Sequence, residues 1–455
     1  MWKPVWIPTR PSQCCQILLV LGMVARTQGQ IPRSCATDWH ISNRTCCPRW
    51  WGDGSPCGSA SKRGYCQELA LSSPWPAGQV GEGGAMDFRL AWPSYFFSRL
   101  CVCQQRYGGV DCGECAHGWV GSQCQQQHLV QRQDLWQMSV PERDLFLDRL
   151  LLAKQTVSSR YVIYASSSRQ PASPFRFQDA SLYNVFAWAH YLCAKPRGDG
   201  QPGIYAHRGP AFPSWHRLYL LSFEREMRNL TGDRDFYLPY WTWAGQQSCD
   251  VCTDNLFGSN DAQGFLNPNS RFRNWLTFCS GEGVHELDFG LVCPPGATLR
   301  IRRHPDVNRG LGGLPSRQDV KLSLQLHSYD STPYNERALS SFRNTLEGYL
   351  LPGDPSILYP SMHNMVHFVC GGTMSSLTYS SNDPLFLTHH AFIDKIFEMW
   401  LRAHPENAHV YPTDPLVPPG HRADDAMPPF IPVARNQDFM RSSLEFGYTY
   451  SNMTI

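Results

Sequence analysis

Two of the 16 histidines in this 455-residue chain, His363 and His367, stand four positions apart in the run Met-His-Asn-Met-Val-His. On a helix this spacing turns both imidazoles to one face, which suits two ligands of a single metal ion. With 16 histidines, however, one such pair can arise by chance. His389 and His390 follow among Phe and Leu residues, where a buried imidazole is costly unless its nitrogens are bonded. A core histidine with satisfied hydrogen bonds is the alternative for this doublet.

Three further histidines form a second set nearer the N-terminus. His190 lies in an apolar helical pattern, His207 in a loop, and His216 near the start of the next helical pattern. Three neutral imidazoles leave one coordination position of a metal open for a small ligand. Imidazole suits copper, zinc, iron and nickel alike, so the ligand type alone does not choose the metal. Two such sites facing each other in a helical core would suit dioxygen bridging two coppers.

Apolar residues at helical spacing predict the elements that position these side chains. Asp394, one turn after His390, is expected to orient a ligand ring or to hold the helix end. Ser361 is a candidate N-cap. Residues 245–340 read as loops with short elements, and the chain after Pro412 is Pro-rich and irregular. The pattern predicts a mainly α fold with a helical bundle core and long loops, its helices spanning 141–156, 181–193, 213–230, 360–368 and 384–402.

Cysteines crowd the N-terminal part, which is typical of disulfides formed in an oxidising compartment. Zinc is the alternative for Cys101-x-Cys103 and Cys112-x-x-Cys115. Pairing cannot be read from the sequence. The segment 101–124 resembles an EGF-like module, and we predict a cysteine-rich EGF-like subdomain over 30–130 followed by the histidine-bearing domain over 131–455. Ten of the 18 cysteines lie in the first of these: Cys35, Cys46, Cys47, Cys57, Cys66, Cys101, Cys103, Cys112, Cys115 and Cys124.

The N-terminal residues predict that the protein is exported from the cytosol. Residues 1–29 combine a weakly basic start, a short apolar run and small residues before Gln30, as a secretory signal peptide does. Sequons at Asn43, Asn229 and Asn452 fit a glycoprotein. No later run reaches about 18 apolar residues, so no membrane span is predicted. A net charge of +2 without a basic face gives no indication of a nucleic-acid partner.

Longer motifs resemble those of the vertebrate tyrosinase family. Residues 210–217, Pro-Ala-Phe-Pro-Ser-Trp-His-Arg, and 238–243, Leu-Pro-Tyr-Trp-Thr-Trp, are similar to the first copper motif of that family. Residues 361–367 and 382–392 are similar to the second. The run 341–348, Ser-Phe-Arg-Asn-Thr-Leu-Glu-Gly, and the spacing of the N-terminal cysteines resemble the family as well. The similarity covers nearly the whole chain after the signal.

The resemblance implies two copper ions in the helical core and dioxygen as co-substrate. It implies ortho-hydroxylation of L-tyrosine to DOPA and oxidation of DOPA to dopaquinone, the first step of melanin synthesis. Phenol and catechol substrates, contacts with related melanosomal proteins, and a place in the melanosome lumen or outside the cell are implied too. The implied residues are His190, His207 and His216 on copper A, His363, His367 and His390 on copper B, His389 beside the substrate, and Asn364 with Glu347 holding a water that can take the phenol proton.

Other functions stay open. A purely structural polar role is the alternative for Asn364 and Glu347. The family also includes related proteins that carry zinc, one of which tautomerises dopachrome, and a catechol oxidase or an inert glycoprotein are further alternatives. The doublet His389-His390 favours a tyrosinase, because the zinc relatives have an apolar residue before a single histidine, whereas Gly209 resembles those relatives.

Four residues depart from the family pattern. Arg208 stands where the family usually has Glu, and Thr242 stands where tyrosinases have Asp. A cation pointing at the metals would oppose their binding. Cys193 and Cys370 are extra, each three residues after a histidine on a predicted helix, and we hypothesise a disulfide between them. Family members continue into a membrane helix that this chain, which stops at Ile455, is expected to lack.

Overall fold

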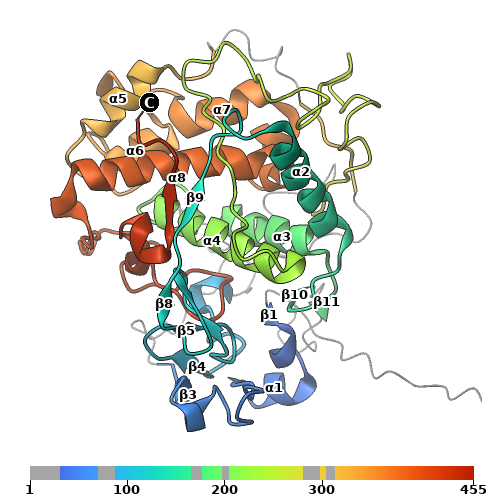
Figure 1. Cartoon of the computed structure of the whole chain (residues 1–455). Helices are drawn as coiled ribbons and strands as arrows, with labels where there is room; N and C mark the ends of the chain where they lie inside the picture. The colour runs from blue at the N-terminus through green and yellow to red at the C-terminus, as the bar shows by residue number, and fades with distance from the viewer. Residues whose placement is uncertain are drawn as a thin grey trace, which may run out of the picture.

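Four helices form the centre of the molecule and carry most of the histidines singled out above (Figure 1). Every residue of the first of them except Asn184 is buried, which explains its almost wholly apolar sequence. The second packs against the first and against the fourth. Because all four are apolar on the sides that meet, their burial stabilises a helical core. They are α3 (Leu182–Ala194), α4 (Phe212–Thr231), α7 (Met362–Cys370) and α8 (Leu385–Ala403).

The computed structural model describes residues 31–69, 88–164, 177–196, 204–279, 298–303 and 313–454. The predicted signal peptide over 1–29 lies outside the described residues. Among the helices of the described part, none is long and apolar enough to cross a membrane.

Three of the remaining helices pack around this core, and the shortest one lies in the cysteine-rich part (Figure 1). Helix α2 begins with a capping box, in which Ser139 and Glu142 bond each other's backbone N–H groups. Helix α6 ends at Gly348, whose φ of 99° is a left-handed conformation. A Cβ at that glycine would lie 2.1 Å from the carbonyl oxygen of Ser361, so glycine lets the end of α6 touch the start of α7. These helices are α1 (Asp38–Ser42), α2 (Val140–Gln155), α5 (Arg317–Leu324) and α6 (Phe342–Glu347).

The five predicted helices are confirmed to within two residues at each end by α2, α3, α4, α7 and α8. Ser361 occupies the N-cap position of α7, but its hydroxyl donates to the carbonyl of Leu350 at 2.5 Å instead of capping the helix. Helix α5 falls inside the segment that was expected to be loops with short elements.

Strands are short and stay at the periphery. Residues 130–132 and 448–450 pair in parallel, so the end of the chain closes against the segment that leads into α2. The sheets outside the cysteine-rich part are β1 (Ile31–Pro32) with β10 (Tyr161–Tyr164) and β11 (Phe177–Gln178), β9 (Val130–Arg132) with β14 (Tyr448–Tyr450), and β12 (Leu350–Leu351) with β13 (Asp354–Leu358).

The cysteine-rich part lies at the lower end of Figure 1. Its strands are β2 (Thr45–Cys46), β3 (Gly64–Glu68) and β4 (Arg99–Cys103) in one sheet, then the pairs β5 (Tyr107–Gly108) with β6 (Glu114–Cys115) and β7 (Trp119–Val120) with β8 (Gln126–Gln127). All ten cysteines are in disulfides, which excludes the zinc alternative for them. The EGF-like module and the boundary near residue 130 stay predictions. The bonds are Cys35–Cys46, Cys47–Cys66, Cys57–Cys101, Cys103–Cys112 and Cys115–Cys124.

Candidate metal centre

Three imidazoles meet between α3 and α4. His190 comes from α3, His216 from the first turn of α4, and His207 from the loop that joins the two helices. All three side chains are buried, and their ring centroids lie 4.9–5.8 Å apart. One ring nitrogen of each lies within 4.8 Å of the others, so the three can hold one metal ion.

A second cluster forms between α7 and α8. The Nε2 atom of His363 lies 3.1 Å from Nε2 of His367 and 3.3 Å from Nε2 of His390. His389 is the fourth histidine of this cluster. Its ring stacks on that of His363 with centroids 5.1 Å apart, and both of its nitrogens are buried without a hydrogen-bond partner among the described residues. The short Nε2 distances favour His390 over its neighbour as the third ligand.

Backbone carbonyls fix the tautomer of three rings. Nδ1 of His216 lies 2.8 Å from the carbonyl oxygen of Phe212, and Nδ1 of His367 lies 2.6 Å from that of Met374. Nδ1 of His363 lies 3.1 Å from the carbonyl oxygen of Glu347. A carbonyl can only accept, so each Nδ1 carries the proton and each Nε2 presents a lone pair. This is the arrangement in which an imidazole binds a metal.

The contact between Nε2 of His363 and Nε2 of His367 therefore joins two lone pairs and is not a hydrogen bond. Such a pair of acceptors at 3.1 Å needs a cation between them. Metal–nitrogen bonds of about 2.0–2.1 Å place neighbouring ligand nitrogens about 2.9–3.5 Å apart. The two distances in this cluster lie within that range, so its residues fit a transition-metal ion.

Desolvation keeps the rings neutral, as metal ligation requires. Burial lowers the pKa of His216 to about 3 and that of His367 to about 4. It also lowers the pKa of His190, His207 and His363 well below the usual value, and neighbouring histidines add to this effect. His389 and His390 are shifted in the same direction for the same reasons.

The two clusters face each other across a few ångströms. The ring of His216 stacks on that of His390 with centroids 4.4 Å apart, and the centroids of His207 and His363 are 6.4 Å apart. Phe386 lies 3.9 Å from the ring of His390 and 4.8 Å from that of His190, so it packs between the clusters. Two metal ions held in these clusters would be close enough to share one small ligand.

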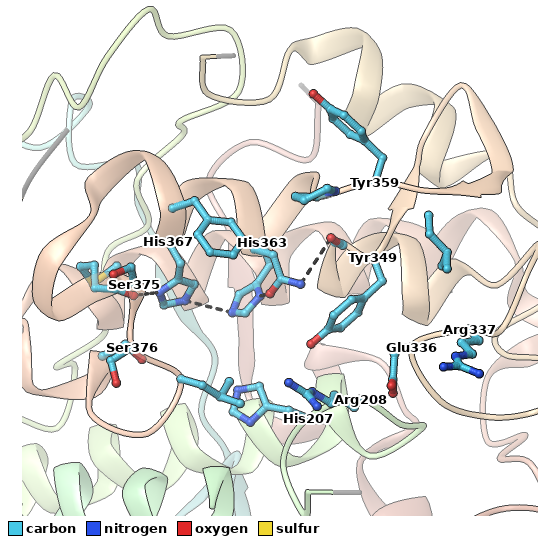
Figure 2. A pocket seen from close by; sticks show the side chains of 18 residues that line it. His207, Arg208, Glu336, Arg337, Tyr349, Tyr359, His363, His367, Ser375 and Ser376 are labelled. Atoms are coloured by element: carbon cyan, nitrogen blue, oxygen red, sulfur yellow. Dashed lines mark hydrogen bonds between the residues drawn. The ribbon is translucent and has the colours of Figure 1, made fainter. Parts of the chain in front are cut away.

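A cavity of about 520 Å³ opens onto this pair of clusters (Figure 2). His207, His363 and His367 form its inner end, and Asn364 lies beside them. Of the other predicted site residues, His389 and Glu347 do not line the cavity in the part of the chain that the structure describes. The substrate-side role of His389 stays a prediction. A volume of this size takes a single aromatic ring with a short chain.

Glu347 and Asn364 flank His363 in different ways. The amide oxygen of Asn364 lies 3.0 Å from Nδ1 of His363, and its Nδ2 donates to the carbonyl of Gly348 at 3.3 Å. The carboxylate of Glu347 accepts from the backbone N–H of Arg208 at 2.6 Å and from Nη1 of Arg343 at 3.1 Å. Burial raises the pKa of Glu347 to about 7, although the two arginines oppose this.

Arg208 and Thr242 differ from the family residues, and the structure gives each a partner. Arg208 is exposed at the mouth of the cavity, where water screens its charge from the clusters. The hydroxyl of Thr242 donates to the carboxylate of Asp134. An aspartate in place of Thr242 would set two carboxylates against each other.

The hypothesis of a Cys193–Cys370 disulfide is wrong: both side chains are buried thiols. The thiol of Cys193 donates instead to the carbonyl of Pro428 at 3.0 Å. Their i, i+3 spacing from histidines places each near the end of its helix but does not make the two thiols face each other.

Both thiols should resist alkylation in the folded protein and react after unfolding. Burial raises the pKa of Cys370 to about 12, so almost no thiolate forms at neutral pH. Mass spectrometry after iodoacetamide treatment, with and without guanidinium, measures this. Labelling of either residue in the folded protein, or a peptide joining the two, would contradict the structure.

Several residues of the cavity wall carried no signal in the sequence. They lie within one stretch of the chain, residues 336–376, but no motif joins them: Glu336, Arg337, Tyr349, Tyr359, Ser375 and Ser376 are examples (Figure 2).

Known proteins are similar to this chain over most of its length. The family model described as "Common central domain of tyrosinase" matches residues 180–403. A tyrosinase of Felis catus is 40% identical over 453 residues, which cover 97% of this chain and 84% of that protein. A 5,6-dihydroxyindole-2-carboxylic acid oxidase of Carassius auratus is 35% identical over 459 residues, which cover 96% of this chain and 86% of that protein. Among solved structures, a mutant polyphenol oxidase from Thermothelomyces thermophila aligns with a TM-score of 0.48 and 19% identity, over 71% of this chain and 88% of its own.

Proposed function

The chain belongs to the tyrosinase family, and from this premise we propose that it oxidises phenols with dioxygen at two copper ions. It hydroxylates L-tyrosine at the ortho position to DOPA and oxidises DOPA to dopaquinone, the first step of melanin synthesis. Overall, one L-tyrosine and one dioxygen give one dopaquinone and one water. The observation that carries this proposal is the pair of facing imidazole clusters whose Nε2 lone pairs need a cation.

We assign the two coppers to the two clusters. Bound copper supplies the activation of dioxygen and the two-electron oxidation of the catechol. The ligands proposed for copper A are His190, His207 and His216, and those for copper B are His363, His367 and His390.

The protein supplies position and a shaped cavity. The Nδ1–H bonds to backbone carbonyls hold the rings of His216, His363 and His367 in their orientations. We propose that Asn364, which lines the cavity beside His363, holds the water that takes the phenol proton. Glu347 already accepts hydrogen bonds from Arg208 and Arg343, and it does not line the cavity. Its proposed effect on that water is therefore indirect, through the residues that it holds in place.

Metal analysis of the purified chain tests the proposal. We expect about two copper ions per chain, and we expect a new near-ultraviolet absorption band when hydrogen peroxide is added to the copper-loaded protein. Turnover of L-tyrosine then separates a tyrosinase from a catechol oxidase. Copper present without this band, or no turnover of either L-tyrosine or L-DOPA, would contradict the proposed activity.

A zinc-binding relative is the second candidate, favoured by Gly209. The same clusters would bind zinc with similar geometry, since imidazole does not discriminate strongly between the two metals. Two zinc ions per chain and dopachrome tautomerisation would be its signature. The doublet His389-His390 argues against it.

The protein belongs to the secretory pathway, and within it we propose the melanosome lumen, with contacts to related melanosomal proteins. Six disulfides between described cysteines support an oxidising compartment. We further propose an EGF-like subdomain over 30–130, a catalytic domain over 131–455, and glycans at Asn43, Asn229 and Asn452, whose side chains are exposed.

A further inference from the structure

The mouth of the cavity carries charges that a simple phenol would not need. Arg208, Glu336 and Arg337 lie together at the end away from His367, and Tyr349 points its hydroxyl toward Arg208 (Figure 2). A phenol ring requires only an apolar slot and the metals. Charged groups at the opposite end match a substrate that carries charge on its side chain.

We propose that Arg208 binds the α-carboxylate of an amino-acid phenol and thereby makes the enzyme prefer L-tyrosine and L-DOPA over the corresponding amines. This inference rests on the proposed oxidase activity. Arg208 stands where the family usually has Glu. In this proposal it is the residue that distinguishes substrates with a carboxylate from those without one.

The backbone around Arg208 is fixed from both sides. Its φ of 60° is a left-handed conformation that non-glycine residues seldom adopt, and its N–H donates to the carboxylate of Glu347 at 2.6 Å. At the next residue, a Cβ on Gly209 would lie 2.7 Å from the ring of His421. The hydroxyl of Tyr329 donates to the carbonyl of Pro210 at 2.5 Å. Strained backbone held in this way is typical of residues that position a functional group.

The guanidinium itself has donors to spare. It has five N–H groups, and it bonds the hydroxyl of Tyr349, while Glu336 and Glu347 act on it electrostatically. Two parallel N–H groups of a guanidinium match the two oxygens of a carboxylate. Arg208 and His207 line the same cavity, so the side chain of a ring bound near the metals can reach this guanidinium.

The ratio of kcat/KM for L-DOPA to that for dopamine tests the proposal in the copper-loaded enzyme. The two substrates differ only in the carboxylate. In Arg208→Ala the ratio should fall about 5- to 15-fold, the low end for a charged hydrogen bond, because water partly screens this exposed guanidinium. In Arg208→Lys the ratio should fall less, because lysine keeps the charge and loses only the paired donors. In Arg208→Glu the ratio should fall further than in Arg208→Ala, because the new carboxylate repels that of L-DOPA.

Arg435→Ala is the control, since this arginine is about half exposed, pairs with Asp424 and does not line the cavity. Its ratio should change less than about threefold. An unchanged ratio in Arg208→Ala, or a loss in Arg435→Ala instead, overturns the assignment.

Binding of L-phenylalanine and phenethylamine, measured by calorimetry, gives a readout that needs no turnover. Arg208→Ala should weaken L-phenylalanine alone. If the unmodified protein oxidises neither L-DOPA nor dopamine, the proposed activity fails, while this binding difference still decides the role of Arg208. Equal weakening of both ligands would overturn it.

Discussion

Replacing His363 with alanine should lower kcat for L-DOPA at least about 1,000-fold and reduce the copper content from about two ions per chain to about one. The Nε2 atom of His363 is the one that lies within 3.3 Å of both His367 and His390. Its loss leaves two imidazoles for the second copper, while His190, His207 and His216 still hold the first. One copper alone cannot deliver two electrons in a coupled step.

Copper content by mass spectrometry and the rate of quinone formation measure these effects. His128→Ala is the control, because His128 bonds the exposed Asp235 and belongs to neither cluster. It should keep both coppers and the rate. His389→Ala should also keep about two coppers, since the proposed ligand is its neighbour. Retention of two coppers by His363→Ala, or loss of one by His389→Ala, would contradict the assignment.

The positions of five helices could be predicted from the sequence because apolar residues recur at helical spacing. The capping box of Ser139 and Glu142, which fixes the first turn of α2, is a local signal that sequence reasoning missed. Four of the six histidines, His216, His363, His367 and His390, could be selected because the family motifs contain them, and the i, i+4 pair on α7 follows from helix geometry alone. These helices and histidines could therefore be predicted from local sequence patterns.

Long-range pairing could not be predicted in the same way. The parallel pairing of Val130–Arg132 with Tyr448–Tyr450 joins segments more than 300 residues apart, and nothing in either tripeptide specifies the other. The error at Cys193 has the same origin, because spacing along one helix does not reveal which group of another segment, here Pro428, faces the thiol.

The charges around the metal clusters also depended on tertiary structure. Asp394 was expected to orient a ligand ring or hold the end of its helix. It does neither, and instead accepts from Nε of Arg217 at 2.6 Å and Nη1 of Arg132 at 3.0 Å. The hydroxyls of Tyr448 and Tyr450 each donate to it at 2.5 Å. This buried network ties β9, α4, α8 and β14 together, next to His216 and one turn from His390.

Asp394→Asn should therefore destabilise the fold by about 3–5 kcal/mol, the range for breaking a buried ion pair. The side chains of Arg132 and Arg217 are fully buried, and that of Asp394 is 2% exposed. An amide keeps one acceptor oxygen and turns its NH₂ group toward arginines that can only donate. The free energy of unfolding in urea, with disulfides intact, measures the loss. Asp424→Asn is the control, because its pair with Arg435 is about half exposed and should contribute less than about 1 kcal/mol.

The pH dependence of this difference identifies its electrostatic part. Burial alone would raise the pKa of Asp394, but Arg217 and Arg132 outweigh it, so the pKa lies below the usual value. The carboxylate then stabilises the fold fully above its unfolded pKa of about 3.9, and this contribution is lost as the pH falls through the lower folded pKa. The difference between the natural protein and Asp394→Asn should stay constant from about pH 5 to 7 and shrink below about pH 4. A difference that persists undiminished in acid would mean that Asp394 acts by shape and not by charge.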